Sequence, residues 1–114
     1  MPLIRVQTSQ PEPPDVNNLL QTLSAKLAQH LKKPESYVMT SFQGNVPMTF
    51  GGTVDPVCFI EVKSIGQMSS RQTQEMSQDF CEVIASDLGV PPNRIYIDFT
   101  DAEGYLWGWN SSTF

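Results

Sequence analysis

Apolar residues along the chain recur with two periods, one of two residues and one of four. The alternating runs predict β-strands at residues 3–7, 37–43, 57–65 and 95–99. The spacing of four predicts two amphipathic helices, each with one apolar stripe. The stripes are Leu19, Leu23, Leu27 and Leu31, and then Met76, Phe80, Ile84 and Leu88. The predicted order is strand, helix, strand, followed by the same three elements again.

Residues that favour helix ends flank both stripes. The proline-rich segment 11–14 precedes the first helix, where proline suits the first turn, and Pro34 ends that helix nearby. Ser69 and Gln72 form the pattern of a capping box before the second helix. Gly89 follows the second helix, at a position where a left-handed residue commonly ends a helix. These signals agree with the periodicity.

The two halves of the chain match position by position. When Pro34 is aligned with Pro91, each residue of the first stripe falls on a residue of the second. The first strand also matches the second half of the chain: with the alignment shifted by one residue, residues 3–8 fall on residues 59–64. Such a duplication of strand, helix and strand is a signal about the fold. It predicts one α+β domain over residues 1–114, with a four-stranded mixed sheet and both helices on one face.

The other face of this sheet is expected to carry a mixture of apolar and charged side chains. Its members are Leu3, Arg5, Tyr37, Met39, Phe59, Glu61, Tyr96 and Asp98. The mixture is too apolar for a plain solvated surface and too polar for a second core. The aromatic-rich end of the chain, residues 105–114, lies outside the duplicated unit and is typical of an anchor on a neighbouring subunit or a pocket wall. Both features predict an oligomer.

Composition and charge narrow the classes of partner. Of the 114 residues, 39% are hydrophobic and 17% are charged, which fits one small globular domain. Seven basic against twelve acidic residues give a net charge of −5, and no basic run is present, so we expect neither nucleic acid nor an anionic membrane as partner. No apolar run is long enough for a bilayer span, and the N-terminus does not resemble a secretory signal. We therefore expect a cytoplasmic protein, with release by a non-classical route left open.

Metal, disulfide and cofactor chemistry have little support in the sequence. Cys58 and Cys81 are too few for a disulfide framework and too far apart for a zinc motif, so we expect core thiols. The single histidine, His30, argues against a multi-histidine metal site and is expected at the surface or edge of its helix. The common nucleotide-binding, hydrolase and metalloprotease motifs are absent. We expect neither cofactor nor metal.

Candidate chemistry lies at the start of the chain. Initiator methionine is normally removed before a small residue, and removal would give Pro2 a free secondary amine at the head of a strand. The reference pKa of an α-amino group is about 7.7–8.0, and a nearby cation or an apolar lining lowers it. A neutral amine can act as a general base. If Met1 is retained, the nitrogen of Pro2 is an amide and cannot do so.

Several segments in order along the chain resemble one family. They are Met1-Pro2-Leu3-Ile4, Lys33-Pro34-x-x-Tyr37, Phe50-Gly51-Gly52, Ser64-Ile65-Gly66, Arg94-Ile95-Tyr96-Ile97 and Gly108-Trp109-Asn110-x-Ser112-Thr113-Phe114. Together they resemble the macrophage migration inhibitory factor family of the tautomerase superfamily, from the first residue to the last. The resemblance implies a homotrimer whose three sheets form a central barrel. It also implies active sites at the subunit boundaries.

The same resemblance implies a role for individual residues. Pro2 matches the catalytic proline, which moves a proton between an enol oxygen and the adjacent carbon. Lys33 matches a pocket lysine that binds a substrate carboxylate and helps to keep Pro2 neutral. Ile65 matches a residue whose backbone contacts substrate oxygens, and Tyr96 matches a tyrosine supplied by the neighbouring subunit. The aromatic positions that border the pocket match Trp109 and Phe114.

Two further positions expected to contact substrate depart from the family pattern. Asp98 stands where vertebrate members carry asparagine, and its carboxylate could repel an anionic substrate. Trp107 replaces a small aliphatic residue at the pocket rim and could narrow or reshape the pocket. The CxxC motif of the vertebrate proteins is missing, since residues 57–60 read Val-Cys-Phe-Ile. We therefore expect no thiol-redox role.

The leading hypothesis is a keto–enol tautomerase acting on phenylpyruvate- or dopachrome-type compounds. A second hypothesis is a cytokine-like factor that binds a receptor protein and has a weak or vestigial pocket. A third is decarboxylation or hydration of a keto acid on the same scaffold. Structural roles also stay open for single residues: Lys33 as a solvated helix-end lysine, Tyr96 as an interface aromatic, and Trp109 and Phe114 as residues that seal a trimer.

Overall fold

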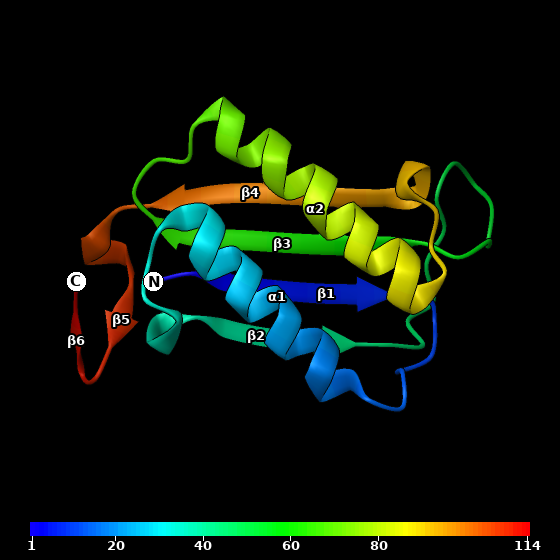
Figure 1. Cartoon of the computed structure of the whole chain (residues 1–114), viewed down its shortest axis with the longest axis horizontal. Helices are drawn as coiled ribbons and strands as arrows, with labels where there is room; N and C mark the ends of the chain where they lie inside the picture. Colours follow the sequence, from blue (N-terminus) through cyan, green and yellow to red (C-terminus); the bar gives the residue numbers. More distant parts are fainter.

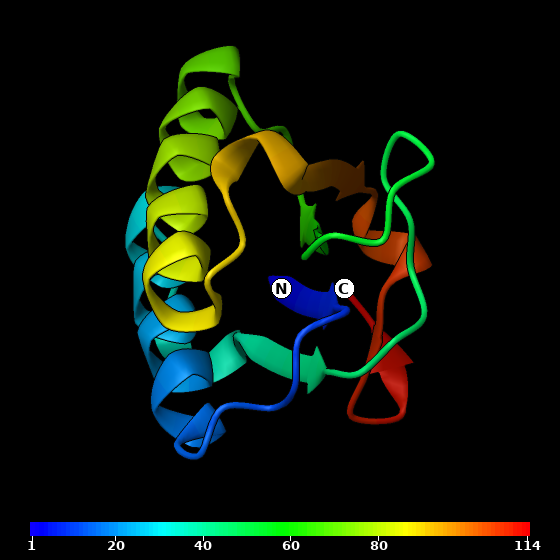
Figure 2. The same cartoon turned by 90° about the vertical axis from the view of Figure 1, so that its right-hand side faces the viewer.

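The computed structural model describes all 114 residues and contains a four-stranded sheet with two helices packed on one face (Figures 1 and 2). The elements are β1 (Leu3–Thr8), α1 (Val16–Leu31), β2 (Met39–Gln43), β3 (Cys58–Ile65), α2 (Ser70–Leu88) and β4 (Ile95–Ala102). The strand order is β2-β1-β3-β4. Each helix connects a parallel strand pair, and the central β1–β3 pair is antiparallel. The predicted mixed sheet with two helices on one face is therefore confirmed.

Two strand boundaries differ from the prediction by more than one residue, and β1 and β3 each differ at one end by a single residue. The segment Glu35–Tyr37 forms a 3₁₀ turn, and β2 begins only at Met39, because the chain must turn after Pro34 before it reaches the sheet edge. At the other edge, β4 continues beyond the predicted end, as far as Ala102. Its polar end lacks the alternation that the prediction relied on, but it pairs in register with the end of β3.

Local caps place the residues that follow α1. Lys32 ends this helix in the left-handed conformation, with φ of 54°. The amide of Lys33 then donates to the carbonyl of Ala28 at 3.0 Å, which satisfies one of the last free carbonyls of the helix. The helix end thus fixes the backbone from which the Lys33 side chain departs. At α2, the predicted capping box and the left-handed Gly89 are both confirmed.

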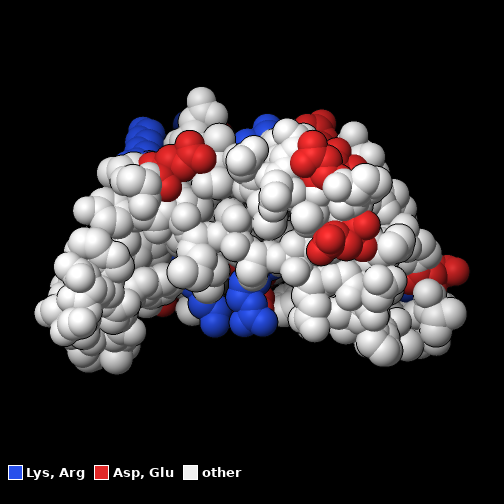
Figure 3. All heavy atoms as spheres, turned by 90° about the horizontal axis from the view of Figure 1, so that it is seen from below, with Lys and Arg blue, Asp and Glu red and all other residues white.

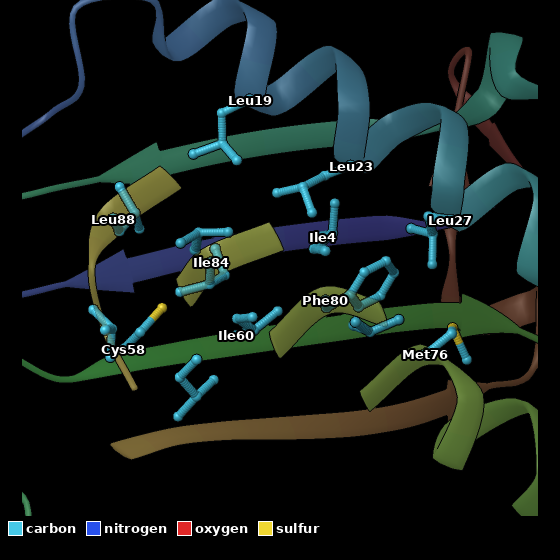
Figure 4. Close-up of a cluster of buried hydrophobic side chains, with 14 of the residues drawn as sticks. Ile4, Leu19, Leu23, Leu27, Cys58, Ile60, Met76, Phe80, Ile84 and Leu88 are labelled. Atoms are coloured by element: carbon cyan, nitrogen blue, oxygen red, sulfur yellow. The ribbon is translucent and has the colours of Figure 1, made fainter. Parts of the chain in front are cut away.

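The core lies between the helices and the sheet (Figure 4). Both apolar stripes are buried against alternate residues of β1 and β3, such as Ile4 and Ile60, which are 0% exposed. Cys58 belongs to this core, and burial, followed by the proximity of Cys81, raises its pKa to about 12. Burial also raises the pKa of the half-buried Cys81. Both thiols are free.

A charged cluster joins the two helices at their edge. Asp79 of α2 accepts a hydrogen bond from Nζ of Lys26 at 2.8 Å, and its second oxygen lies 2.7 Å from Nε2 of His30. The His30 ring meets Phe80 edge-on, with 5.8 Å between ring centroids. His30 is therefore an edge residue of the helix pair, as expected, with an apolar ring on one side and a carboxylate on the other.

Arg94 holds the long loop between β2 and β3. This residue ends the 3₁₀ turn Pro92–Arg94, and its guanidinium donates to four carbonyls of the loop. The acceptors and distances are Pro56 at 2.8 Å, Asp55 at 2.9 Å, Phe50 at 3.2 Å and Thr53 at 3.3 Å. The guanidinium also lies 5.3 Å from the centre of the Phe50 ring. One side chain therefore sets the shape of residues 50–56.

The end of the chain returns to the start of the sheet. A 3₁₀ turn, Gly104–Leu106, leads into a small hairpin of β5 (Gly108–Trp109) and β6 (Ser112–Thr113). The amide of Phe114 then donates to the carbonyl of Gly104 at 3.2 Å. Figure 1 accordingly places both chain termini at the same end of the sheet. None of the helices has the length and apolar character that a membrane span requires.

The Asp79 cluster predicts a pH-dependent contribution to stability. Burial opposes ionisation of Asp79, but the hydrogen bonds and charges of Lys26 and His30 outweigh it and keep its pKa below the ordinary value of 3.8. This contribution is present above that ordinary value and is lost as the pH falls through the lower pKa of the folded protein. We expect Asp79→Asn to lower the free energy of unfolding by about 1 kcal/mol at neutral pH. Urea denaturation at several pH values measures the difference.

Glu75→Gln is the matched control, because Glu75 forms an exposed pair with Arg71 on the same helix. It should change the free energy of unfolding by less than about 0.5 kcal/mol. A cost of Asp79→Asn that stayed constant down to acidic pH would contradict the assignment to the ion pairs.

The Arg94 contacts predict that Arg94→Lys loosens the loop although the charge is kept. A lysine ammonium cannot reach four carbonyls in the geometry of the planar guanidinium. We expect the free energy of unfolding to fall by about 1–3 kcal/mol and cleavage between residues 50 and 56 to become faster. Chemical denaturation and limited proteolysis measure the two effects. Arg71→Lys, at an exposed helix position, should alter neither.

Candidate functional site

Pro2 lies at the head of β1, where the backbone enters the sheet. It is buried, and its carbonyl accepts a hydrogen bond from the amide of Met39 at 3.0 Å. A cavity of about 270 Å³ opens beside it. The cavity is lined by Met1, Pro2, Leu3, Ser36, Tyr37, Val38, Met39, Trp107, Gly108 and Trp109. Its walls are mostly apolar, as is typical of small-molecule sites.

Aromatic rings from two distant parts of the chain form one wall of this cavity. Tyr37 meets Trp109 edge-on, with 5.7 Å between ring centroids. Phe114 stacks on Trp109 at 5.5 Å and an interplanar angle of 18°. Trp107 is half-buried and lines the cavity, whereas Trp109 is 52% exposed. The site is therefore aromatic and open on one side, which suits a small planar ligand.

The side chain of Lys33 brings a positive charge to the same end of the sheet. Its ammonium donates to the hydroxyl of Ser64 at 3.0 Å and to the carbonyl of Ile65. Ser64 and Ile65 are the last two residues of β3, so the lysine bridges the end of α1 and the end of that strand. The structure thus brings Lys33 and Ile65 into direct contact.

The electrostatic effect of Lys33 reaches the terminal amine. Partial burial, then the charge of Lys33 and a hydrogen bond with its side chain, lower the pKa of the Met1 amine below its ordinary value of 8.0. An amine in this environment loses its proton more readily than one in water. The start of β1 is therefore a place where a terminal amine can be neutral while the Lys33 ammonium lies beside it.

Tyr96 and Asp98 lie elsewhere in the chain. Tyr96 is 65% exposed and its ring lies 4.8 Å from that of Phe50, beside a second cavity of about 330 Å³. Tyr96 pairs with Phe59, which in turn pairs with Gln7 of β1. Gln7 is about 13 Å along β1 from Leu3, the residue that follows Pro2. Asp98 is also exposed and accepts a hydrogen bond from Thr100 at 3.2 Å. Within one chain, neither side chain therefore lies beside Pro2.

The face of the sheet that carries Tyr96 and Asp98 is open. Figure 3 views the molecule from the β2 edge, with this face in profile along the lower outline, which is concave between two projecting parts and has basic atoms in the concavity. Glu61 lies at the centre of this face, 3.6 Å from Arg5 and 3.8 Å from Lys63. The mixture of apolar and charged residues expected for this face is confirmed, except that Tyr37 lies in the 3₁₀ turn before β2 and does not belong to the face.

Two residues at the site were missed in the sequence, for different reasons. Tyr37 falls within the predicted strand 37–43, but it lies in a 3₁₀ turn that directs its ring to Trp109. Ser64 carried a detectable signal, because it follows Cys58, Ile60 and Val62 in the buried alternation of β3. A hydroxyl at a core position needs a partner, and here the partner is the lysine.

The whole chain matches the family described as macrophage migration inhibitory factor (MIF), over residues 1–114. A macrophage migration inhibitory factor from Meriones unguiculatus is 35% identical, with 100% of this chain and 99% of that protein covered. A homolog from Brugia malayi is 34% identical with the same coverage.

Solved structures agree with these sequence matches. The crystal structure of a homologue from Prochlorococcus marinus has 55% identity and a TM-score of 0.95, and 98% of each chain is covered. The structure from Trichinella spiralis has 30% identity and a TM-score of 0.90, with 98% of this chain and 99% of that one covered. The resemblance inferred from short motifs is confirmed by the fold and along the full length, and the chain belongs to the macrophage migration inhibitory factor family.

Proposed function

We propose that the chain, once Met1 is removed, is a cofactor-independent keto–enol tautomerase for small aromatic α-keto acids of the phenylpyruvate type, or for dopachrome-like compounds. One observation carries this proposal: the buried Pro2 begins a strand beside an aromatic cavity, with the Lys33 ammonium close to the terminal amine. Removal of Met1 would place the free amine on Pro2 itself. The family match supports this function.

The proposed reaction is a proton transfer between oxygen and carbon of the substrate. The neutral Pro2 amine takes the enol hydroxyl proton and delivers a proton to the adjacent carbon, so that the amine ends as it began. The Lys33 ammonium binds the substrate carboxylate and, with the Ile65 backbone, stabilises charge on oxygen. Trp109 and Phe114 border the aromatic ring of the substrate.

A homotrimer, with the three sheets forming a barrel, would complete this site. Tyr96 would then come from the neighbouring subunit and position the ring or donate a hydrogen bond. Its exposure and its distance from Pro2 along the strands support this arrangement, because it has no route to the cavity within its own chain. The charged residues of the open face would line the polar interior of the barrel.

Two residues of this chain would set its substrate range. Asp98 is placed on the same face of β4 as Tyr96 and forms no ion pair with a basic side chain, so at the subunit boundary it would disfavour a second negative charge on the substrate. Trp107 fills part of the cavity beside Pro2 and would limit the size of the ring. Efficient substrates are then small and carry one carboxylate.

The first prediction concerns Pro2. Protein whose intact mass shows removal of Met1 should accelerate phenylpyruvate tautomerisation, and Pro2→Gly should reduce kcat/KM by about 100-fold or more, because a positioned general base contributes that much. A form that retains Met1 should be similarly inactive, since its Pro2 nitrogen is an amide. The enol absorbance of phenylpyruvate follows the reaction.

The controls separate loss of chemistry from loss of fold. All three forms should give the same circular dichroism spectrum and the same mass in solution. A folded, trimmed wild type that is no faster than buffer contradicts the tautomerase proposal with this substrate. Other keto acids and protein-binding assays would then test the remaining hypotheses.

A second prediction tests whether Tyr96 acts across a subunit boundary. Pro2→Gly and Tyr96→Ala chains should each be impaired alone, and co-refolding them in equal amounts should restore activity. Random assembly into cyclic trimers makes about a quarter of the sites fully wild type. Mixing without refolding is the control. If co-refolded mixtures stay at the average of the two variants, Tyr96 does not complete a site on another chain.

A further inference from the structure

The geometry points to Ser64 as a positioning residue: its buried hydroxyl holds the Lys33 ammonium beside the N-terminal amine. This inference rests on the proposed roles of Pro2 and Lys33 and extends them to a residue that does not itself contact substrate. It begins from an anomaly in the core-facing side of β3. Three apolar residues on this side are followed by Ser64, which is only 1% exposed.

A buried hydroxyl without a partner would cost about 1–3 kcal/mol. Ser64 avoids this cost because its oxygen accepts the hydrogen bond from Nζ of Lys33 at 3.0 Å. Its own hydroxyl is directed at the carbonyl of Ile65, at 3.5 Å. The lone pairs of the serine therefore face the lysine. On the buried side of β3, the only hydroxyl is at position 64, where the Lys33 ammonium lies.

The contact fixes one side chain that would otherwise have many conformations. The backbone of Lys33 is held by its bond to Ala28, but four rotatable bonds separate that backbone from the ammonium. Two acceptors at the end of β3, the Ser64 hydroxyl and the Ile65 carbonyl, define where the ammonium rests. Without Ser64, only one of these acceptors remains, and the side chain regains conformational freedom.

Other ionisable groups near the amine do not duplicate the effect of Lys33. Tyr37 lines the cavity but is not a basic side chain. Lys63 is opposite Leu3 on β3, but its ammonium is on the open face of the sheet, 3.8 Å from Glu61. Lys33 is the one charged group that acts on the terminal amine. Any change in its position should therefore be detected at that amine.

The duplication supplies a matched control. Thr8 is the residue of the first unit that aligns with Ser64 of the second, and it is 0% exposed. Its hydroxyl donates to the carbonyl of Val57 at 2.8 Å and has no contact with a lysine. Thr8→Val thus removes a buried hydroxyl from the same sheet, at the opposite end from the amine.

The experiment titrates the Pro2 amine by NMR in Met1-trimmed protein, comparing wild type, Ser64→Ala, Ser64→Cys, Ser64→Thr and Thr8→Val. We expect Ser64→Ala and Ser64→Cys to raise the pKa of the amine by about half a unit to one unit, because the positive charge is no longer held beside it. The acidic limb of the kcat/KM profile should move to higher pH by the same amount. Ser64→Thr, which keeps the hydroxyl, should restore the wild-type value, and Thr8→Val should leave it unchanged.

An amine pKa equal to that of wild type in both Ser64→Ala and Ser64→Cys would overturn the inference, even if those variants are less stable. A shift of the same size in Thr8→Val would also overturn it, by showing a general effect of destabilisation. The titration needs no substrate. An inactive wild type would therefore contradict the proposed function, but the pKa of the amine in the variants would still decide whether Ser64 positions Lys33.

Discussion

The antiparallel register between β1 and β3 is the constraint on which the site depends. It sets Leu3 opposite Lys63, and so brings the head of one strand beside the end of another that is distant in the sequence. A slip of one residue would exchange the two faces of β1 and expose Ile4 and Val6. The packing of both helices on the sheet holds the register, and the position of Pro2 relative to Ser64 and Ile65 follows from it.

The site therefore uses parts of the fold that are already fixed for other reasons. The left-handed end of α1 positions Lys33, the end of β3 provides its acceptors, and the terminal segment with its hairpin lines the cavity with Trp107 and Trp109. These three contributions lie at the end of the sheet where Pro2 leads into β1, and the hairpin and Pro2 line a cavity of about 270 Å³ there. Preorganisation of this kind leaves little to rearrange when a small ligand enters.

Periodicity and local signals were enough to predict the sheet, the helices and their caps, because these depend on neighbours along the chain. At the candidate site, some residues could be predicted from the sequence and others could not. Motifs are enough to predict Pro2 and Lys33 as site residues, whereas the contact of Lys33 with Ser64 and the four carbonyls bound by Arg94 join segments that are far apart in the sequence. Such contacts are set by tertiary packing, which no local pattern specifies. The 3₁₀ turn that directs Tyr37 toward Trp109 was missed for the same reason.

The internal repeat implies a second place in the fold with the same backbone surroundings as the site. Aligning the two units places Cys58 at the position of Pro2 and Val90 at the position of Lys33. Both counterparts are buried in the hydrophobic core, at 1% and 0% exposure. The pseudo-equivalent positions therefore carry a thiol and an apolar side chain in place of an amine and an ammonium. Cys58 still lines a cavity, the one of about 330 Å³ beside Tyr96, so the repeated backbone has an opening at both places but a basic amine at only one of them.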